Sequence, residues 1–165
     1  MIEYVKAILT GQFEAALCML NDCLKKCPLE HWEGRIANDT FRQVAYHTLF
    51  YVDFYTSPGE EAFALRDVHH RGGDERSGTA PSAGLTKDET LSYLVICREK
   101  ARETLASETL ESLQRDSGFS RLAFSRGESH LYNIRHVQHH TGQLSAYLRR
   151  IVKDGDRWWV KTGWR

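Results

Sequence analysis

Apolar residues recur every three to four positions in the first part of the chain, which is the spacing of an amphipathic helix. Residues 2–27 keep this spacing, and Pro28 ends it because proline cannot continue a helix. The pattern resumes after Thr40, which forms a capping-box pattern with Gln43 three residues later. We therefore predict a first helix over residues 2–27 and a second that runs to about Tyr55.

Two further stretches of the chain carry the same helical spacing. One starts at Thr86, again with a glutamate three residues later, and we expect it to end near Leu113. The other starts at Ser125 and continues to Ile151. Their predicted inward faces are Leu91, Leu94, Val95, Arg98, Ala101, Arg102 and Leu105, and then Leu131, Ile134, Val137, Leu144, Leu148 and Ile151. Four long amphipathic helices without a convincing strand predict an all-α fold, a four-helix bundle.

A long segment, residues 57–85, separates the second predicted helix from the third and interrupts any regular pattern with glycine and proline. We interpret it as a crossover that carries the chain from one end of the bundle to the other. A functional or mobile loop is the alternative, because connections of this length are uncommon in compact domains. The segment contains His69 and His70, which we expect to be exposed; a flexible lid or extra metal ligands are the less favoured interpretations.

The length of 165 residues suits one domain with a real core, so we expect residues 1–165 to form a single bundle domain. Asp154-Gly155-Asp156 predicts a turn after the fourth helix, and a short aromatic tail follows it. The tail contains Trp158, Trp159 and Trp164. Because tryptophan is costly to leave in water, we expect this tail to cover an edge of the bundle or a partner subunit.

The charged residues balance, with 22 Lys and Arg against 22 Asp and Glu. No net field therefore favours a polyanion, which argues against nucleic acid or an acidic membrane surface as the main partner. The first residues lack the order of a secretory signal, and no apolar run approaches the ~20 residues of a membrane span. We therefore expect a cytoplasmic protein without a membrane anchor.

Three of the four cysteines, Cys18, Cys23 and Cys27, lie in the first predicted helix, and Cys97 lies in the third. In a reducing compartment all four remain thiols. Cys23 and Cys27 continue the apolar face of their helix, which favours packed core residues because a free cysteine behaves as a small hydrophobic residue. Binding of a soft metal ion by the cluster is the alternative.

The clearest sign of chemistry is a pair of histidines in the fourth predicted helix. His136 and His140 are four residues apart, so their rings are neighbours on one face. His47 lies on the inner flank of the second helix, and the three imidazoles can converge if the two helices are neighbours. Such a site would bind a divalent ion and leave positions open for water or substrate. The spacing alone is a weak signal, and three ordinary, partly buried histidines are the alternative.

Ligation by nitrogen alone suits zinc, nickel, cobalt or copper better than magnesium or calcium.

Other candidate residues carry weaker signals. We expect His139 to point away from the site, and His31 and His130 to be surface or capping residues. The aromatic residues near His47 are expected to be core, with an apolar substrate pocket as the alternative; they are Tyr46, Phe50, Phe54 and Tyr55. Arginines that would suit an anionic group by charge alone, and that we expect on the surface, are Arg135, Arg149 and Arg150.

Two segments carry a resemblance to a known family: Val44-Ala-Tyr-His47-Thr-Leu-Phe50 and His136-Val-Gln-His139-His140-Thr-Gly142-Gln143-Leu144. The chain resembles the DinB/YfiT-like superfamily of metal-dependent proteins over nearly its whole length. The resemblance implies a four-helix bundle with a long crossover between helices two and three, and often a homodimer. It also implies that His47, His136 and His140 bind a divalent metal ion, nickel or zinc. Gly142 would allow close helix approach, and Gln143 would hydrogen-bond near the site.

Related bundles include thiol-dependent S-transferases and a mycothiol-dependent maleylpyruvate isomerase. The resemblance therefore implies a metal-dependent enzyme that activates a low-molecular-weight thiol, or water, to attack a small-molecule substrate. The first alternative is a non-catalytic, metal-stabilised dimer with a role in stress response. The second is an interaction bundle that binds a protein partner through its tryptophan tail. No residue pattern identifies a general base or the groups that would hold the thiol.

Overall fold

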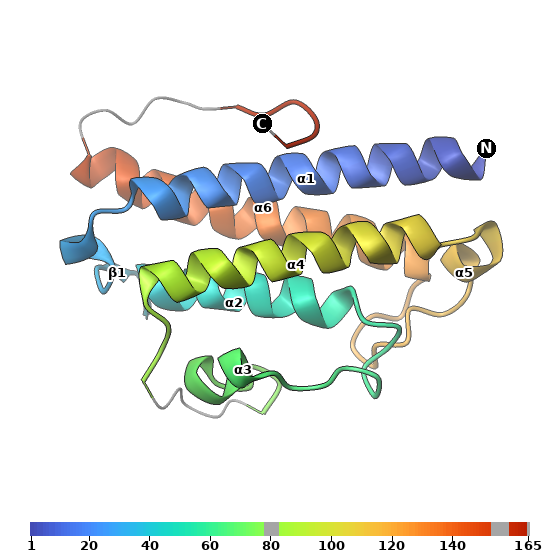
Figure 1. Cartoon of the computed structure of the whole chain (residues 1–165), viewed down its shortest axis with the longest axis horizontal. Helices are drawn as coiled ribbons and strands as arrows, with labels where there is room; N and C mark the ends of the chain where they lie inside the picture. Colours follow the sequence, from blue (N-terminus) through green and yellow to red (C-terminus); the bar gives the residue numbers. More distant parts are fainter. Residues whose placement is uncertain (78–82, 153–158, 165) are drawn as a thin grey trace.

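Four long helices dominate the structure, a computed structural model that describes residues 1–77, 83–152 and 159–164 (Figure 1). They are α1 (Ile2–Lys26), α2 (Phe41–Tyr55), α4 (Lys87–Ser107) and α6 (Arg126–Ile151). Their starts agree closely with the four predicted stretches, and the predicted all-α bundle is confirmed. None of the helices in the described ranges is long and apolar enough to cross a membrane.

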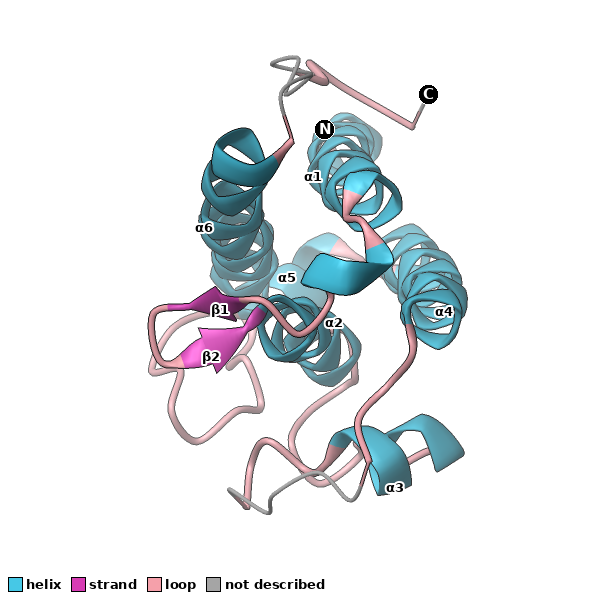
Figure 2. Ribbon diagram, turned by 90° about the vertical axis from the view of Figure 1, so that its left-hand side faces the viewer, coloured by secondary structure: helices cyan, strands magenta, loops and turns pink. Residues whose placement is uncertain are grey.

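Each long helix packs against two of the others. α1 lies between α4 and α6, and α2 lies between the same two helices on the opposite side, as the end-on view shows (Figure 2). The interior that they share is apolar and includes the buried side chains of Phe13, Leu49, Leu94 and Val137. Burial of each large apolar side chain stabilises the folded state by about 1.5–3 kcal/mol relative to leaving that side chain in water. The packing makes α2 and α6 neighbours, which is the condition that a shared histidine site requires.

Three of the long helices begin with the capping boxes that the sequence predicts. At the start of α2, the backbone N–H of Gln43 donates to Thr40 Oγ1 (3.2 Å), and the Thr40 N–H donates to the Gln43 side chain (2.7 Å). The same reciprocal pairs form between Thr86 and Glu89 and between Ser125 and Glu128. Each cap satisfies donors that a helix end leaves free and contributes about 1 kcal/mol. Local residues therefore set these helix starts.

The connection between α2 and α4 runs back from the last turn of α2 to the other end of that helix, where α4 begins, because the two helices point in the same direction (Figure 1). This arrangement confirms the predicted crossover. The connection contains a short helix that the sequence did not predict, α3 (Asp67–Gly72). A buried carboxylate on α2 anchors the crossover to its neighbours: Asp53 accepts hydrogen bonds from Arg66 Nε (3.1 Å), the Tyr93 hydroxyl (3.1 Å) and Lys100 Nζ (2.5 Å).

The expectation that His69 is exposed is wrong. The ring is buried in α3, where its Nε2–H donates to the Tyr93 oxygen (2.7 Å) and its Nδ1 accepts from the backbone N–H of Arg66 (2.8 Å). Burial lowers the pKa of His69 to about 4, although Asp53 nearby opposes the shift. The imidazole is therefore neutral at neutral pH and helps to fix the crossover. His70 is exposed, as expected.

The third predicted helix is divided in the structure. α4 ends before Glu108, which takes an extended conformation (ψ 144°), and a separate short helix, α5 (Leu110–Gln114), follows. The prediction of one helix to near Leu113 is therefore wrong. The physical reason is that Glu108 turns into the interior, where its Oε1 accepts a hydrogen bond from Arg126 Nε (2.9 Å). A charge pair between distant residues here overrides the local helical pattern.

The segment between α1 and α2 contains small elements that the sequence did not predict. A 3-10 helix (Leu29–His31) is followed by two strands of two residues each, β1 (Arg35–Ile36) and β2 (Asp39–Thr40). The strands pair antiparallel in a tight turn in which Ala37 has a positive φ of 54°. This hairpin leads directly into the Thr40 cap of α2 and therefore positions the first turn of that helix.

The inward faces of α4 and α6 differ from the prediction at three positions, one of which is the exposed Arg102. Val95 is 56% exposed and Leu131 is 53% exposed, although both were expected to face the core. On α4, Tyr93 and Cys97 take the buried positions instead. Tyr93 turns inward because its hydroxyl reaches the buried carboxylate of Asp53. The hydrogen bond to Asp53 thus gives α4 a buried face that differs from the one predicted from its apolar residues alone.

The described part of the aromatic tail lies along α1. Val160 packs against Ala15 and Cys18, and the ring of Trp164 lies 4.3 Å from the guanidinium of Arg98 on α4. These contacts agree with the expectation that the tail covers an edge of the bundle.

Other predictions for this end of the chain have different outcomes. Trp159 is 71% exposed, so it does not cover the bundle. The turn predicted at Asp154-Gly155-Asp156, and Trp158, lie outside the described residues. The cysteines are buried, which confirms that they are core residues; they are Cys18, Cys23, Cys27 and Cys97.

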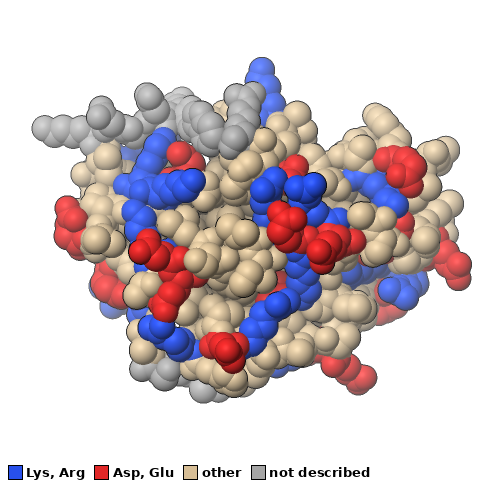
Figure 3. Space-filling view, in the orientation of Figure 1, with Lys and Arg blue, Asp and Glu red and all other residues tan. Residues whose placement is uncertain are grey.

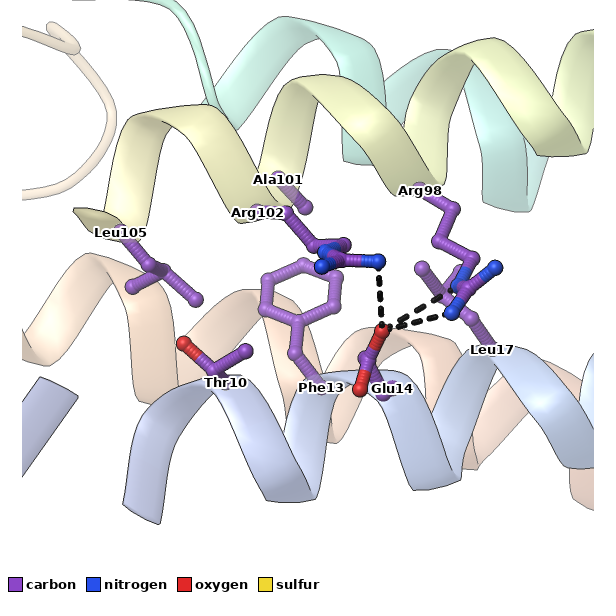
Figure 4. Close-up of a pocket in the computed structure, with 8 residues that line it drawn as sticks. All are labelled: Thr10, Phe13, Glu14, Leu17, Arg98, Ala101, Arg102 and Leu105. Carbon is purple, nitrogen blue, oxygen red and sulfur yellow. Dashed lines mark hydrogen bonds and ion pairs between the residues drawn. The ribbon is translucent and has the colours of Figure 1, made fainter. Parts of the chain in front are cut away.

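Positive and negative side chains are interspersed on the face of the molecule shown in Figure 3. Along the seam between α1 and α4, Glu14 Oε1 accepts from Arg98 Nε (3.2 Å) and a terminal Arg98 nitrogen (2.8 Å), and Arg102 lies 3.7 Å away (Figure 4). Phe13 and Leu105 line the same seam, and the space that they border has no room for a water molecule. Arg98 and Arg102, predicted on the inward face, instead pair with Glu14 at the edge of the contact between α1 and α4.

Candidate metal centre

Three histidines from two helices meet at one point between α2 and α6. His136 Nε2 lies 3.3 Å from His47 Nε2 and 3.1 Å from His140 Nε2. The three possible ligand atoms all lie within 4.8 Å of one another. His136 and His140 stand one turn apart on α6, as their spacing predicts, and His47 faces them from α2. The structure therefore brings together the three residues that the sequence singled out.

The separations between these nitrogens match those around a tetrahedral ion. Bonds of about 2.0–2.1 Å from zinc to nitrogen, set at tetrahedral angles, place neighbouring ligand nitrogens about 3.3 Å apart. The two close pairs in the structure lie at 3.1 and 3.3 Å. The cluster is therefore compatible with a divalent metal ion in both the chemistry and the spacing of its donors.

The outer ring nitrogens of two of these histidines have hydrogen-bond acceptors. His140 Nδ1 lies 2.8 Å from Gln143 Oε1, and His47 Nδ1 lies 3.3 Å from Glu75 Oε2. Because both oxygens accept, each Nδ1 carries the proton and each Nε2 directs a lone pair at the centre. The contact at Gln143 agrees with the expectation that this residue hydrogen-bonds near the site.

Hydrogen bonds among the three rings account for the cluster less well than a metal ion does. His136 Nε2 contacts both other Nε2 atoms, and a proton on it would serve one neighbour and leave the other without a donor. Its second nitrogen, His136 Nδ1, is buried and has no partner among the described residues. An ion at the centre would satisfy all three inward lone pairs together.

Burial keeps the imidazoles of His136 and His140 neutral. Burial, followed by the neighbouring rings of His140 and His47, lowers the pKa of His136 to about 3. Burial also lowers the pKa of His140, although its hydrogen bond to Gln143 opposes the shift. A metal ion binds the unprotonated form of imidazole. These two rings are therefore ready to act as ligands at neutral pH without first losing a proton.

Aromatic rings form the inner wall of the site. The centroid of the Tyr51 ring lies 4.9 Å from that of His47 and 5.4 Å from that of His136, and Tyr132 stacks on His136 at 6.5 Å. The outer side is less enclosed, since the His47 side chain is 34% exposed. Protein therefore covers one side of the cluster and solvent reaches the other.

Comparison with known families agrees with this geometry. A profile of the DinB superfamily matches residues 12–144, a range that includes all three histidines. The chain belongs to the DinB superfamily. This match confirms the resemblance seen in the two histidine-containing segments. No curated protein and no solved structure gives a significant match.

Two further histidines of this DinB protein lie outside the centre. His139 is exposed and points away from the site, as predicted, with its ring centroid 4.9 Å from that of His140. His31 is half-buried at the end of the 3-10 helix, and its Nδ1 lies 3.2 Å from the Tyr147 hydroxyl. His31 therefore joins that helix to α6.

The expectation that His130 lies at the surface is wrong. The ring is buried, and its Nε2–H donates to Glu108 Oε1 (2.8 Å), which also accepts from Arg126. Burial opposes ionisation of Glu108, but hydrogen bonds from His130, Ser112 and Arg126 together lower its pKa to about 2. Burial lowers the pKa of His130, so the ring is neutral beside the charged pair. This buried cluster ties the corner between α4 and α5 to α6.

The remaining candidates from the sequence have mixed outcomes. Gly142 is exposed and faces open space, so the expectation that it allows close helix approach is wrong. Core positions are confirmed for Tyr46, Phe50, Phe54 and Tyr55. Surface positions are confirmed for Arg135, Arg149 and Arg150. Sequence reasoning missed Glu75, because it lies in a glycine-rich segment without periodic spacing that would relate it to His47.

Proposed function

We propose that this DinB protein binds a divalent metal ion, nickel or zinc, through His47, His136 and His140. We further propose that the centre activates a low-molecular-weight thiol, or water, to attack a small electrophile. The observation that carries the proposal is the convergence of three imidazole nitrogens, with close pairs at 3.1 and 3.3 Å. The contacts of His47 with Glu75 and of His140 with Gln143 support it, because they direct lone pairs toward the ion.

The chemistry follows from the charge of this donor set. A bound divalent ion would supply positive charge that lowers the pKa of a thiol or a water molecule. Three neutral rings leave that charge uncompensated, and the solvent side of the cluster gives the reactants access. In the S-transfer, the thiol proton goes to solvent and the sulfur electron pair forms a bond to the electrophilic carbon. The leaving group departs with the electron pair of the bond that breaks.

The aromatic wall would limit where the reactants can lie. Tyr51 covers the inner edges of His47 and His136, so a small molecule can approach from the side on which His47 is exposed. We also propose a cytoplasmic homodimer. The four cysteines are buried and none is in a disulfide, which supports a reducing compartment.

The alternative function is a non-catalytic dimer that the ion stabilises. The position of the histidines favours this alternative as well, because an ion held by His47 and by both histidines of α6 would cross-link two helices of the bundle. The exposed ring of Trp159 offers a surface for association. In this role the protein would need an ion but no substrate.

A screen of the metal-loaded protein tests the proposal. Wild type, His140→Ala and His139→Ala would be loaded with Zn²⁺ or Ni²⁺ and assayed against a panel of small thiols and electrophiles. His139 is the matched control, because it is an exposed histidine on the same helix. We expect turnover by wild type and His139→Ala and none by His140→Ala. If loaded wild type turns over no member of a broad panel, catalysis is rejected in favour of the stabilising role.

A further inference from the structure

The crossover segment contributes one side chain to the surroundings of the histidine cluster. Glu75 lies between α3 and α4, and its Oε2 is 3.3 Å from His47 Nδ1. The two side chains are similarly exposed, 31% for Glu75 and 34% for His47. Among the described crossover residues, Glu75 is the one that hydrogen-bonds to a histidine of the cluster. It therefore links the crossover to α2, a helix of the bundle.

The position of Glu75 shows how it would act. It contacts Nδ1, whereas the nitrogen that faces the centre is His47 Nε2, on a different edge of the ring. Glu75 therefore acts through His47 and is not itself placed as a ligand. A carboxylate at Nδ1 fixes the tautomer and the orientation of a ligand imidazole and increases its basicity.

The backbone beside Glu75 is held against α2. The Tyr46 hydroxyl donates to the carbonyl oxygen of Gly73 (2.5 Å), two residues before Glu75. Gly72 lies so close to the Tyr46 ring that a Cβ there would come within 2.1 Å of it. On the other side, Arg76 is held by two hydrogen bonds to Asp74 (2.9 and 2.8 Å). These contacts hold the backbone near Glu75 against α2, and the Glu75 side chain meets His47, the residue that follows Tyr46.

We infer that Glu75 is a positioning residue that couples metal binding to closure of residues 73–77 over His47. The inference rests on the proposed metal binding by the three histidines. If the ion binds more tightly when Glu75 holds His47, then by linkage the bound ion must also stabilise the closed position of the segment. The position of residues 73–77 would thus depend on whether an ion is bound by the three histidines.

Two measurements on the full chain test this coupling. The first is the Zn²⁺ affinity, obtained by competition with a chelator, and the second is hydrogen exchange of the amides of residues 73–77 with and without Zn²⁺. The variants are Glu75→Ala, Glu75→Gln, which keeps an acceptor oxygen, and Glu61→Ala. Glu61 is the matched control, an exposed glutamate in the same crossover. Circular dichroism would check that each variant keeps its helices.

We expect Glu75→Ala to bind Zn²⁺ about tenfold more weakly than wild type, at the low end of the range for outer partners of metal ligands because the contact is partly exposed. Glu75→Gln, which keeps the acceptor but loses the charge, should bind more tightly than Glu75→Ala and no more tightly than wild type. Glu61→Ala should bind like wild type. Zn²⁺ should slow exchange of residues 73–77 in wild type and not in Glu75→Ala. Equal affinity in Glu75→Ala, or protection that survives this substitution, would overturn the inference. Failure of wild type itself to bind Zn²⁺ would instead refute the proposed function.

Discussion

His47 Nε2 and His136 Nε2 lie 3.3 Å apart, although 89 positions separate the two residues in the sequence. The contact depends on the packing of α2 against α6 and on neutral rings with their lone pairs turned inward. Because the rings come from two different helices, an ion at this point would act on the chemistry of the site and on the stability of the bundle together.

Loss of either histidine on α6 should empty the centre. Untagged wild type should carry nearly one equivalent of nickel or zinc per chain, and His136→Ala and His140→Ala should each lose it, because two remaining nitrogens bind a divalent ion weakly. His139→Ala should keep its metal, since His139 points away from the site. Elemental analysis by plasma mass spectrometry measures the content. Retention of metal by His136→Ala would contradict the assignment of the ligands.

Removal of the ion should lower the melting temperature of wild type. A ligand at 100 times its Kd stabilises the folded state by about 2.7 kcal/mol, which for a chain of this size shifts melting by on the order of 5–10 °C. Calorimetry with added Zn²⁺ and with a chelator would measure the shift, and His140→Ala should show none. An unchanged wild-type curve would mean that no ion prefers the folded state, and it would exclude the stabilising role.

Bound metal should persist below the pH at which an ordinary histidine takes up a proton, about 6.5. Protons compete with the ion for the ring nitrogens, and burial lowers the pKa of His136 to about 3 and also lowers that of His140. Proton competition at these two ligands therefore begins at lower pH than usual. Metal content after dialysis at stepwise lower pH would show this. Half-loss at or above pH ~6.5 would contradict it.

The buried ring of His69 should make the metal-free protein less stable as the pH falls from about 6.5 toward 4. The unfolded chain takes up a proton at the higher value, whereas the folded protein takes it up at the lower one, so between them the unfolded state binds more protons. Both nitrogens of His69 are already used, by Tyr93 and by the Arg66 N–H. Buried His130 contributes with the same sign.

Urea denaturation at several pH values, with chelator present, measures this dependence. His69→Asn removes the titrating group, so its free energy of unfolding should change less over the same range, whatever its absolute stability. Equal pH dependence in the variant and in wild type would show that His69 does not contribute to the pH dependence of the free energy of unfolding.

Removing the carboxylate of Glu108 should destabilise the fold strongly. Glu108→Ala would leave Arg126 buried without its charge partner, a change that typically costs 3–5 kcal/mol. Glu3→Ala, which breaks the exposed pair with Lys6, should cost about 0–1 kcal/mol. Urea denaturation at neutral pH compares the two. Similar losses in both variants would show that the buried pair is not a main support of this corner.

The parts of the structure that could be predicted from sequence depend on short spacings. Thr40, Thr86 and Ser125 each find their capping partner three residues away, so the helix starts were predictable. His136 and His140 were predictable as a pair for the same reason, since a helix places residues four apart on one face. The place of His47 opposite them also needed the resemblance, because spacing alone did not establish that α2 and α6 pack together.

The parts that were missed depend on partners far along the chain. Local patterns place His69 and His130 at the surface. In the structure His69 is buried against Tyr93, 24 positions away, and His130 against Glu108, 22 positions away. The break before α5 has the same cause, because Glu108 leaves the helix to reach Arg126. No local pattern shows that a polar side chain will find such a partner, and local rules therefore place it in solvent.

The order of the helices has a consequence for synthesis on the ribosome. α1 packs against α4 and α6, and α2 packs against the same two helices, so the first half of the chain has no complete set of neighbours of its own. A growing chain that already contains His47 still lacks both other histidines until α6 has emerged. The apolar faces of α1 and α2 therefore stay exposed until α4 and α6 have emerged, and during that time they can aggregate or bind chaperones. A site formed by all three histidines can therefore exist only after α6 has emerged.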